Sequence, residues 1–129
     1  MSTLQTNKIQ HLTSGFNNVV QFVDGAGTEN GTLCRAWVNF NGTGTVAIRG
    51  SFNVTSITDN GTGDYTVNFS SALADANYSF VTCGDNTNAR FITLGNSASV
   101  PATGSVRVSS INTAFAAADI LFANVAIFR

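Results

Sequence analysis

A period of two runs through most of the chain and limits the folds that it can adopt. From Leu33 onward, apolar residues alternate with polar ones in short segments, as in Tyr65, Val67 and Phe69. This spacing puts one kind of side chain on each face of a strand, which is typical of antiparallel sheets buried on one side. The predicted strands are Leu33–Phe40, Thr45–Ser51, Phe52–Thr58, Asp64–Ser70, Tyr78–Gly84, Arg90–Leu94, Ser105–Ile111 and Asp119–Phe128.

Turn sequences separate these strands at regular intervals. The runs Asn41–Gly44 and Asp59–Asp64 carry Asn-Gly pairs, which favour tight hairpins because glycine and asparagine accept positive φ. About eight short strands with polar turns predict an all-β fold, an antiparallel β-sandwich of jelly-roll-like type, over residues 33–129. The only helical candidate is Thr113–Ala118.

The first 32 residues lack this alternation and are predicted to form an N-terminal arm and a connector. The glycine-rich run Gly25–Gly31 is typical of a flexible connector. An arm of this kind would dock the domain onto another protein, and its apolar residues are the candidates for that contact: Leu4, Ile9, Leu12 and Phe16.

The C-terminal segment 120–128 is apolar on both faces apart from Asn124. A strand that is apolar on both sides is expected to be covered on both sides. Either a second chain covers the outer face, or the strand lies centrally under a loop. The first alternative predicts an interface between chains at Ile120, Phe122, Val125, Ile127 and Phe128.

The low charge of the chain argues against several functions. Charged residues make up 10% of the sequence and the net charge is −1, so no basic surface for nucleic acid is expected. Asn, Thr, Ser and Gly instead account for 55 of the 129 residues. No apolar run is long enough to cross a bilayer, so no membrane insertion is expected, and the N-terminus has no apolar segment of a secretory signal.

No arrangement of residues predicts catalysis, a metal site or a cofactor. The single histidine, His11, has no nearby acid, and no strained Gly-x-Ser-x-Gly turn occurs. Asp59 and Asp64 could approach each other across one hairpin, but turn capping accounts for both. The same loop lacks the later glutamate of a calcium loop. We therefore expect that the protein is not an enzyme.

Cys34 and Cys83 lie in alternating segments, where each is interpreted as a small core residue with a free thiol. A disulfide between them or a reactive thiol are the alternatives.

Sugar binding is a further possibility raised by the residue types. An aromatic ring stacks on the C–H face of a sugar while amides bond its hydroxyls. Trp37, Tyr65 and Tyr78 supply the aromatic rings, and the polar loop with Asp85, Asn86 and Asn88 supplies the polar groups. The competing interpretation puts Trp37, Tyr65 and Tyr78 in the core.

Two long segments resemble a known family. The segment Cys34–Val54 contains Ala-Trp-Val-Asn-Phe-Asn-Gly, Ser56–Phe69 contains Thr-Asp-Asn-Gly-Thr-Gly-Asp-Tyr-Thr-Val-Asn-Phe, and Asp75–Tyr78 reads Asp-Ala-Asn-Tyr. This pattern resembles a C-terminal β-domain of tail fibres and other virion proteins of tailed bacteriophages, closely over Leu33–Phe80 and loosely beyond. The resemblance implies a homotrimeric structural protein and brings no catalytic residue.

These observations predict a virion protein on the outside of the particle, made in the host cytoplasm. The first hypothesis is a tail fibre or receptor-binding component that attaches to a host-surface glycan or protein as a trimer. The arm would then contact other virion proteins. A capsid decoration protein and a monomeric carbohydrate-binding module are the alternatives.

Overall fold

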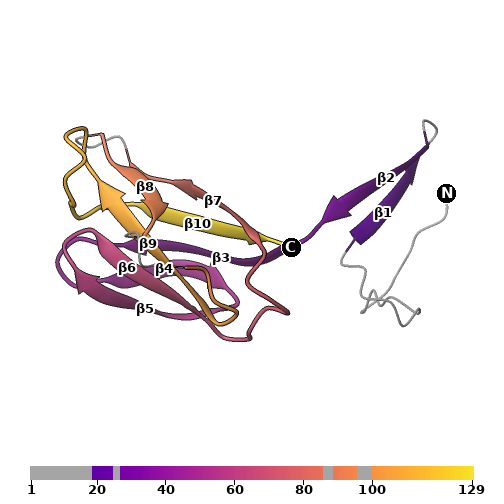
Figure 1. Cartoon of the computed structure of the whole chain (residues 1–129), viewed down its shortest axis with the longest axis horizontal. Helices are drawn as coiled ribbons and strands as arrows, with labels where there is room; N and C mark the ends of the chain where they lie inside the picture. The colour runs from indigo at the N-terminus through magenta and orange to yellow at the C-terminus, as the bar shows by residue number, and fades with distance from the viewer. Residues whose placement is uncertain (1–18, 25–26, 86–88, 96–99) are drawn as a thin grey trace.

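Ten β-strands and no helix make up the part of the chain that the computed structural model describes, which is residues 19–24, 27–85, 89–95 and 100–129 (Figure 1). Within those ranges, no helix could span a membrane.

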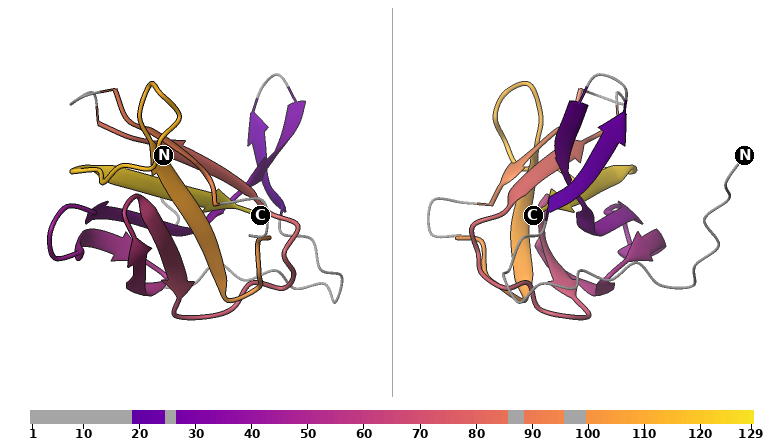
Figure 2. Two further views of the ribbon diagram at one scale, coloured as in Figure 1. Left: turned by 60° about the vertical axis from the view of Figure 1, so that its left-hand side comes forward. Right: turned by 90° about the vertical axis from the view of Figure 1, so that its right-hand side faces the viewer.

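Eight of the strands form two antiparallel four-stranded sheets in separate layers (Figures 1 and 2). The first sheet has the order β4 (Ala47–Phe52), β3 (Cys34–Asn41), β10 (Ala123–Phe128), β7 (Ser79–Cys83). The second has the order β5 (Val54–Gly61), β6 (Asp64–Phe69), β9 (Ser105–Ile111), β8 (Phe91–Leu94). The predicted antiparallel β-sandwich and its eight strands are confirmed.

The chain crosses from the first sheet to the second at Asn53, which separates β4 from β5. Asn53 has a φ of 53°. Its side-chain Nδ2 donates to the carbonyls of Arg35 on β3 and Ser71 after β6, and its Oδ1 accepts from the backbone amide of Ser71. The predicted strand Phe52–Thr58 therefore begins too early. Phe52 ends β4 and is exposed, whereas Val54 is buried.

The core lies between the two sheets and consists of the inward residues of each alternating strand. Its largest members are Tyr65, Phe40, Ile120 and Ile127. Phe40 from the first sheet meets Tyr65 from the second edge-to-face, with ring centroids 5.2 Å apart. Such pairs add to the free energy of burial and fix the orientation of both rings.

The Tyr65 hydroxyl holds three segments together at one end of the core. It donates to the carbonyl of Gly42 at 2.7 Å and lies 3.1 Å from Asp119 Oδ1, which also accepts from the Gly63 amide. Burial and the Asp119 carboxylate raise the pKa of Tyr65, so its hydroxyl keeps the proton that it donates. Gly63 has a φ of 64°, and a Cβ there would lie 2.4 Å from a backbone oxygen, so a side chain does not fit.

A hairpin that the sequence did not predict precedes the sandwich. Strands β1 (Val19–Asp24) and β2 (Gly27–Thr32) pair antiparallel, and Figure 1 places them to one side of the two sheets. The run Gly25–Gly31 is the predicted flexible connector, and its described part, Gly27–Gly31, lies in strand β2. Strand pairing uses backbone groups, which glycine supplies as well as any residue.

The helical candidate Thr113–Ala118 is a turn and not a helix. Asn112 Oδ1 accepts from the amides of Ala114 and Ala116, and Phe115 has a φ of 60°, which is incompatible with a right-handed helix. The asparagine side chain therefore replaces helical hydrogen bonds here.

Replacing Tyr65 by Phe should lower the free energy of unfolding by about 1–3 kcal/mol, because buried acceptors lose their donor. Calorimetric melting of wild type and variant measures this loss. Tyr78→Phe serves as the comparison, since the Tyr78 hydroxyl donates over longer distances, 3.2 and 3.0 Å, to the carbonyls of Ala102 and Ser105 and should cost less. Equal melting temperatures for wild type and Tyr65→Phe would contradict this role.

Candidate functional site

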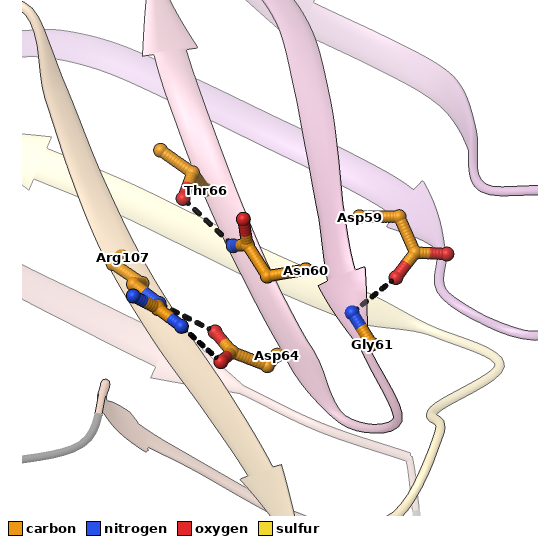
Figure 3. Close-up of polar contacts among 6 residues, drawn as sticks. All are labelled: Asp59, Asn60, Gly61, Asp64, Thr66 and Arg107. Carbon is orange, nitrogen blue, oxygen red and sulfur yellow. Dashed lines mark hydrogen bonds and ion pairs between the residues drawn. The ribbon is translucent and has the colours of Figure 1, made fainter.

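The outer faces of the two sheets differ in chemistry. On the second sheet, amides and hydroxyls bond one another across strands: Asn60 donates to Thr66 Oγ1 at 2.9 Å, and Asn68 donates to Thr58 Oγ1 at 2.9 Å (Figure 3 shows the first of these). The donors and acceptors of these side chains are paired with one another, and uncharged polar groups cover this face. Such a face can lie against water with few charged residues.

The same face carries an ion pair between β6 and β9. Arg107 donates from Nε to Asp64 Oδ1 at 2.8 Å and from Nη2 to Oδ2 at 2.5 Å (Figure 3). These hydrogen bonds lower the pKa of Asp64 below its ordinary value of 3.8. The planar fork of arginine fits a carboxylate in this two-bond arrangement.

The acids considered as a catalytic pair or calcium ligands have structural roles. Asp64 is held by Arg107, and Asp59 Oδ1 accepts from the Gly61 amide at 2.9 Å as a turn cap (Figure 3). In the described ranges no group of three or more His, Cys, Asp or Glu residues could hold a metal ion.

An apolar row crosses the outer face of the first sheet. The strand registers pair Trp37 with Phe52 on one side and with Ala126 on the other, and pair Ala126 with Val81. Trp37 is 43% exposed, Phe52 55% and Val81 58%. Side chains directly opposite on neighbouring strands touch, so these four form one continuous band. We call it the outer apolar row.

A polar row lies beside the outer apolar row on the same face. Asn39 on β3 is paired with Asn124 on β10, and Asn39 Nδ2 donates to Asn124 Oδ1 at 2.7 Å. We call these two residues the amide pair. Asn39 could have been found from the sequence, because it shares the face of Trp37 two positions away. Asn124 could not, because its place beside Asn39 depends on the register of two strands distant in sequence.

The structure divides the residues predicted to contact a sugar. Trp37 lies on the surface, whereas Tyr65 and Tyr78 are buried, so the core interpretation holds for the two tyrosines and fails for Trp37. Burial raises the pKa of Tyr78 to about 12. Asp85 Oδ2 accepts from the amides of Leu121 and Phe122 at 2.9 and 3.0 Å, so this carboxylate fixes the segment before β10. Asn86 and Asn88 lie outside the described residues.

The predicted interface between chains is corrected for three of its five residues. Ile120, Val125 and Ile127 are at most 2% exposed because they face the second sheet, so the core of one chain accounts for them. Phe122 is 45% exposed and Phe128 is half-buried. Strand β10 is central in its sheet, as the second alternative had it, but no loop among the described residues is shown over its outer face, which carries Asn124 and Ala126.

Both cysteines are free thiols, and the disulfide alternative is not observed. Cys34 is half-buried, but Cys83 is exposed on the outer face beside Asn124, so the core interpretation is wrong for Cys83. The candidate docking residues of the arm (Leu4, Ile9, Leu12 and Phe16) lie outside the described residues.

No protein-family model, curated protein or solved structure matches the chain. The resemblance to bacteriophage appendages therefore stays a prediction from the sequence motifs.

Replacing Asp64 by Asn should lower the melting temperature at about pH 7 and leave it unchanged in strong acid. The pKa of Asp64 is lower in the folded protein than in the unfolded chain, so its ion pair stabilises the fold above the ordinary value of 3.8 and is lost as the pH falls below it. Melting of both proteins across this pH range measures the effect.

Asp59→Asn is the matched control, since asparagine keeps the oxygen that caps Gly61 and loses only the charge. The melting temperature of Asp59→Asn should equal that of the wild-type protein at every pH. A gap between wild type and Asp64→Asn that persists at about pH 2 would contradict the ion-pair explanation.

Proposed function

We propose that the protein is a structural component on the exterior of a bacteriophage particle, a tail fibre or receptor-binding component that acts as a homotrimer. The observation that carries this proposal is the placement of the motif Ala36–Asn41. Its alternate residues Ala36, Val38 and Phe40 fill the core, which leaves Trp37 and Asn39 on an open face. The motif that resembles phage appendages thus displays an aromatic and an amide outside the core.

The sandwich suits a particle exterior for a second reason. Hydroxyls and amides that already bond one another cover one outer face, so the domain needs few charges to stay in water. Contact surfaces without strong charges lose little solvation when they meet a partner. In a trimer three weak receptor contacts would act together, and avidity would then exceed the affinity of one site.

The interface between the three chains is assigned to the segment around Phe122. Leu121 and Phe122 are both exposed, and the Arg49 guanidinium lies 4.2 Å from the centre of the Phe122 ring. Exposed apolar patches mark contact sites between proteins, and Leu121 and Phe122 would contribute to such a patch in the trimer. Of the residues predicted from the sequence to form this interface, the assignment retains Phe122 and excludes the buried Ile120, Val125 and Ile127.

Two other functions remain as candidates. A capsid decoration protein would use the same sandwich and would bind the neighbouring capsid subunits through the N-terminal arm. A monomeric carbohydrate-binding module is favoured by one observation, the exposed Trp37 beside the amide pair. The oligomeric state and the location on a particle separate these candidates.

Immunoelectron microscopy tests the proposal directly. Antibody against the sandwich should label the outside of intact particles purified from a lysate in which the chain is expressed from its own genome. Label at the tail supports the receptor-binding role, and label over the head supports the decoration role. Chain found only in the soluble fraction would overturn both.

Light scattering of the purified chain should give the mass of a trimer, and Phe122→Asp should reduce it to that of a monomer. The new carboxylate would lie beside Arg49 and can pair with it, so the fold should persist, which circular dichroism checks. Phe115→Asp is the matched control, because Phe115 is 84% exposed and belongs to the turn after β9. A trimer that survives Phe122→Asp would remove the assigned interface.

A further inference from the structure

A groove of about 260 Å³ lies on the outer face of the first sheet, over the part of the outer apolar row from Trp37 to Val81. Trp37 and Val81 line it, and Ala126 lies between them in the strand register. Because alanine is much smaller than its two neighbours, it forms the floor and they form the walls.

The position of the indole keeps this groove open. The nearest indole atoms, Cη2 and Cζ3, lie 3.5 and 3.6 Å from where a Cβ of Gly50 would stand. The ring therefore leans toward β4, over a residue without a side chain, and away from Ala126. One face of an aromatic ring is thus available to a ligand on the β10 side.

Asn124 of the amide pair lines the groove, and Asn39 lies beside it as its hydrogen-bond partner. The bond from Asn39 to Asn124 fixes both amides in place. Asn39 Oδ1 accepts no hydrogen bond from any described residue, and Asn124 Nδ2 makes only a long contact, 3.4 Å, with the Cys83 carbonyl. One acceptor and one donor therefore remain for a ligand.

No acidic, basic or histidine side chain lines the groove. A charged ligand would lose its hydration there without gaining a partner of opposite charge. The chemistry that fits is neutral, with an apolar face for the indole and hydroxyls for the amides.

We propose that this groove binds a neutral saccharide, with one sugar ring stacked on Trp37 and its hydroxyls bonded to Asn39 Oδ1 and Asn124 Nδ2. This inference rests on the proposed function and deepens it, because it names the chemical class of the receptor. A second copy of the chain fits less well. A stable protein interface buries about 800 Å² on each partner, whereas the outer apolar row is one residue wide and borders the amide pair.

The single tryptophan of the sequence makes the test direct, because all tryptophan fluorescence comes from Trp37. The probes are glucose, galactose and mannose hexasaccharides and chitohexaose, titrated into the full chain. At least one should change the emission in a saturable way, and heparin, an anionic control, should not. No change with any neutral probe would overturn the proposal.

Variants then locate the site. Ala126→Leu fills the floor and leaves Trp37 as the reporter, so it should abolish the change in emission. Trp37→Ala, measured by isothermal titration calorimetry, should weaken binding about tenfold or more, and Trp37→Phe should restore part of it. Phe91→Ala removes an exposed aromatic from the other sheet and should bind as wild type does. Equal affinity for Ala126→Leu and wild type would place the sugar elsewhere and overturn the proposal.

Two further results separate this inference from the function on which it rests. If Trp37→Ala reduced the native mass of the purified chain, the groove would be an interface with a second copy. That result would overturn the proposed saccharide site. Labelled particles without sugar binding would overturn this inference alone, whereas sugar binding without labelled particles would overturn the virion role and leave the carbohydrate-binding module.

Discussion

The hydroxyl of Tyr65 is the constraint from which the arrangement of the first sheet follows. It lies in the core on β6 of the second sheet, yet its partners are the turn after β3 and the segment before β10. The Gly42 amide also donates to the Ile120 carbonyl at 2.8 Å, which ties that turn to the same segment. With those two points fixed, β10 can pair with β3 in one register only, since a shift by one residue would turn Val125 and Ile127 outward.

That register decides what the outer face contains. Ala126 lies between Trp37 and Val81, and Asn124 lies beside Asn39, because the inward residues Ala123, Val125 and Ile127 are already committed to the core. The outer apolar row and the amide pair are thus consequences of how the core closes. A buried hydroxyl at one end of the sandwich positions a surface groove several residues away.

The period-two pattern was enough to predict all eight strands of the sandwich and, in regularly alternating strands such as β6 and β9, which residues face inward. It failed for Phe52 and Cys83, which lie on the outer face. It could not tell which strands are neighbours, because pairing depends on contacts between residues as distant as Asn39 and Asn124. The C-terminal strand illustrates the limit: its two apolar faces suggested a second chain, whereas Ile127 faces the core of its own chain and small Ala126 occupies the outer face. Asp85 likewise looked like a ligand contact because its two backbone partners lie more than thirty positions away.

The scarcity of charge has a consequence for any partner of this protein. Complementary charges accelerate encounter and reject wrong partners, and a chain with net charge −1 and an uncharged groove has little of either effect. Selectivity on the proposed face would have to come from shape: the width between Trp37 and Val81, and the fixed direction of two amides. One such contact is weak, since a ring stacked on an aromatic contributes little beyond the area it buries. A protein that recognises neutral surfaces in this way gains most from presenting several copies together, which is the physical reason that the proposed trimer and the proposed saccharide site support each other.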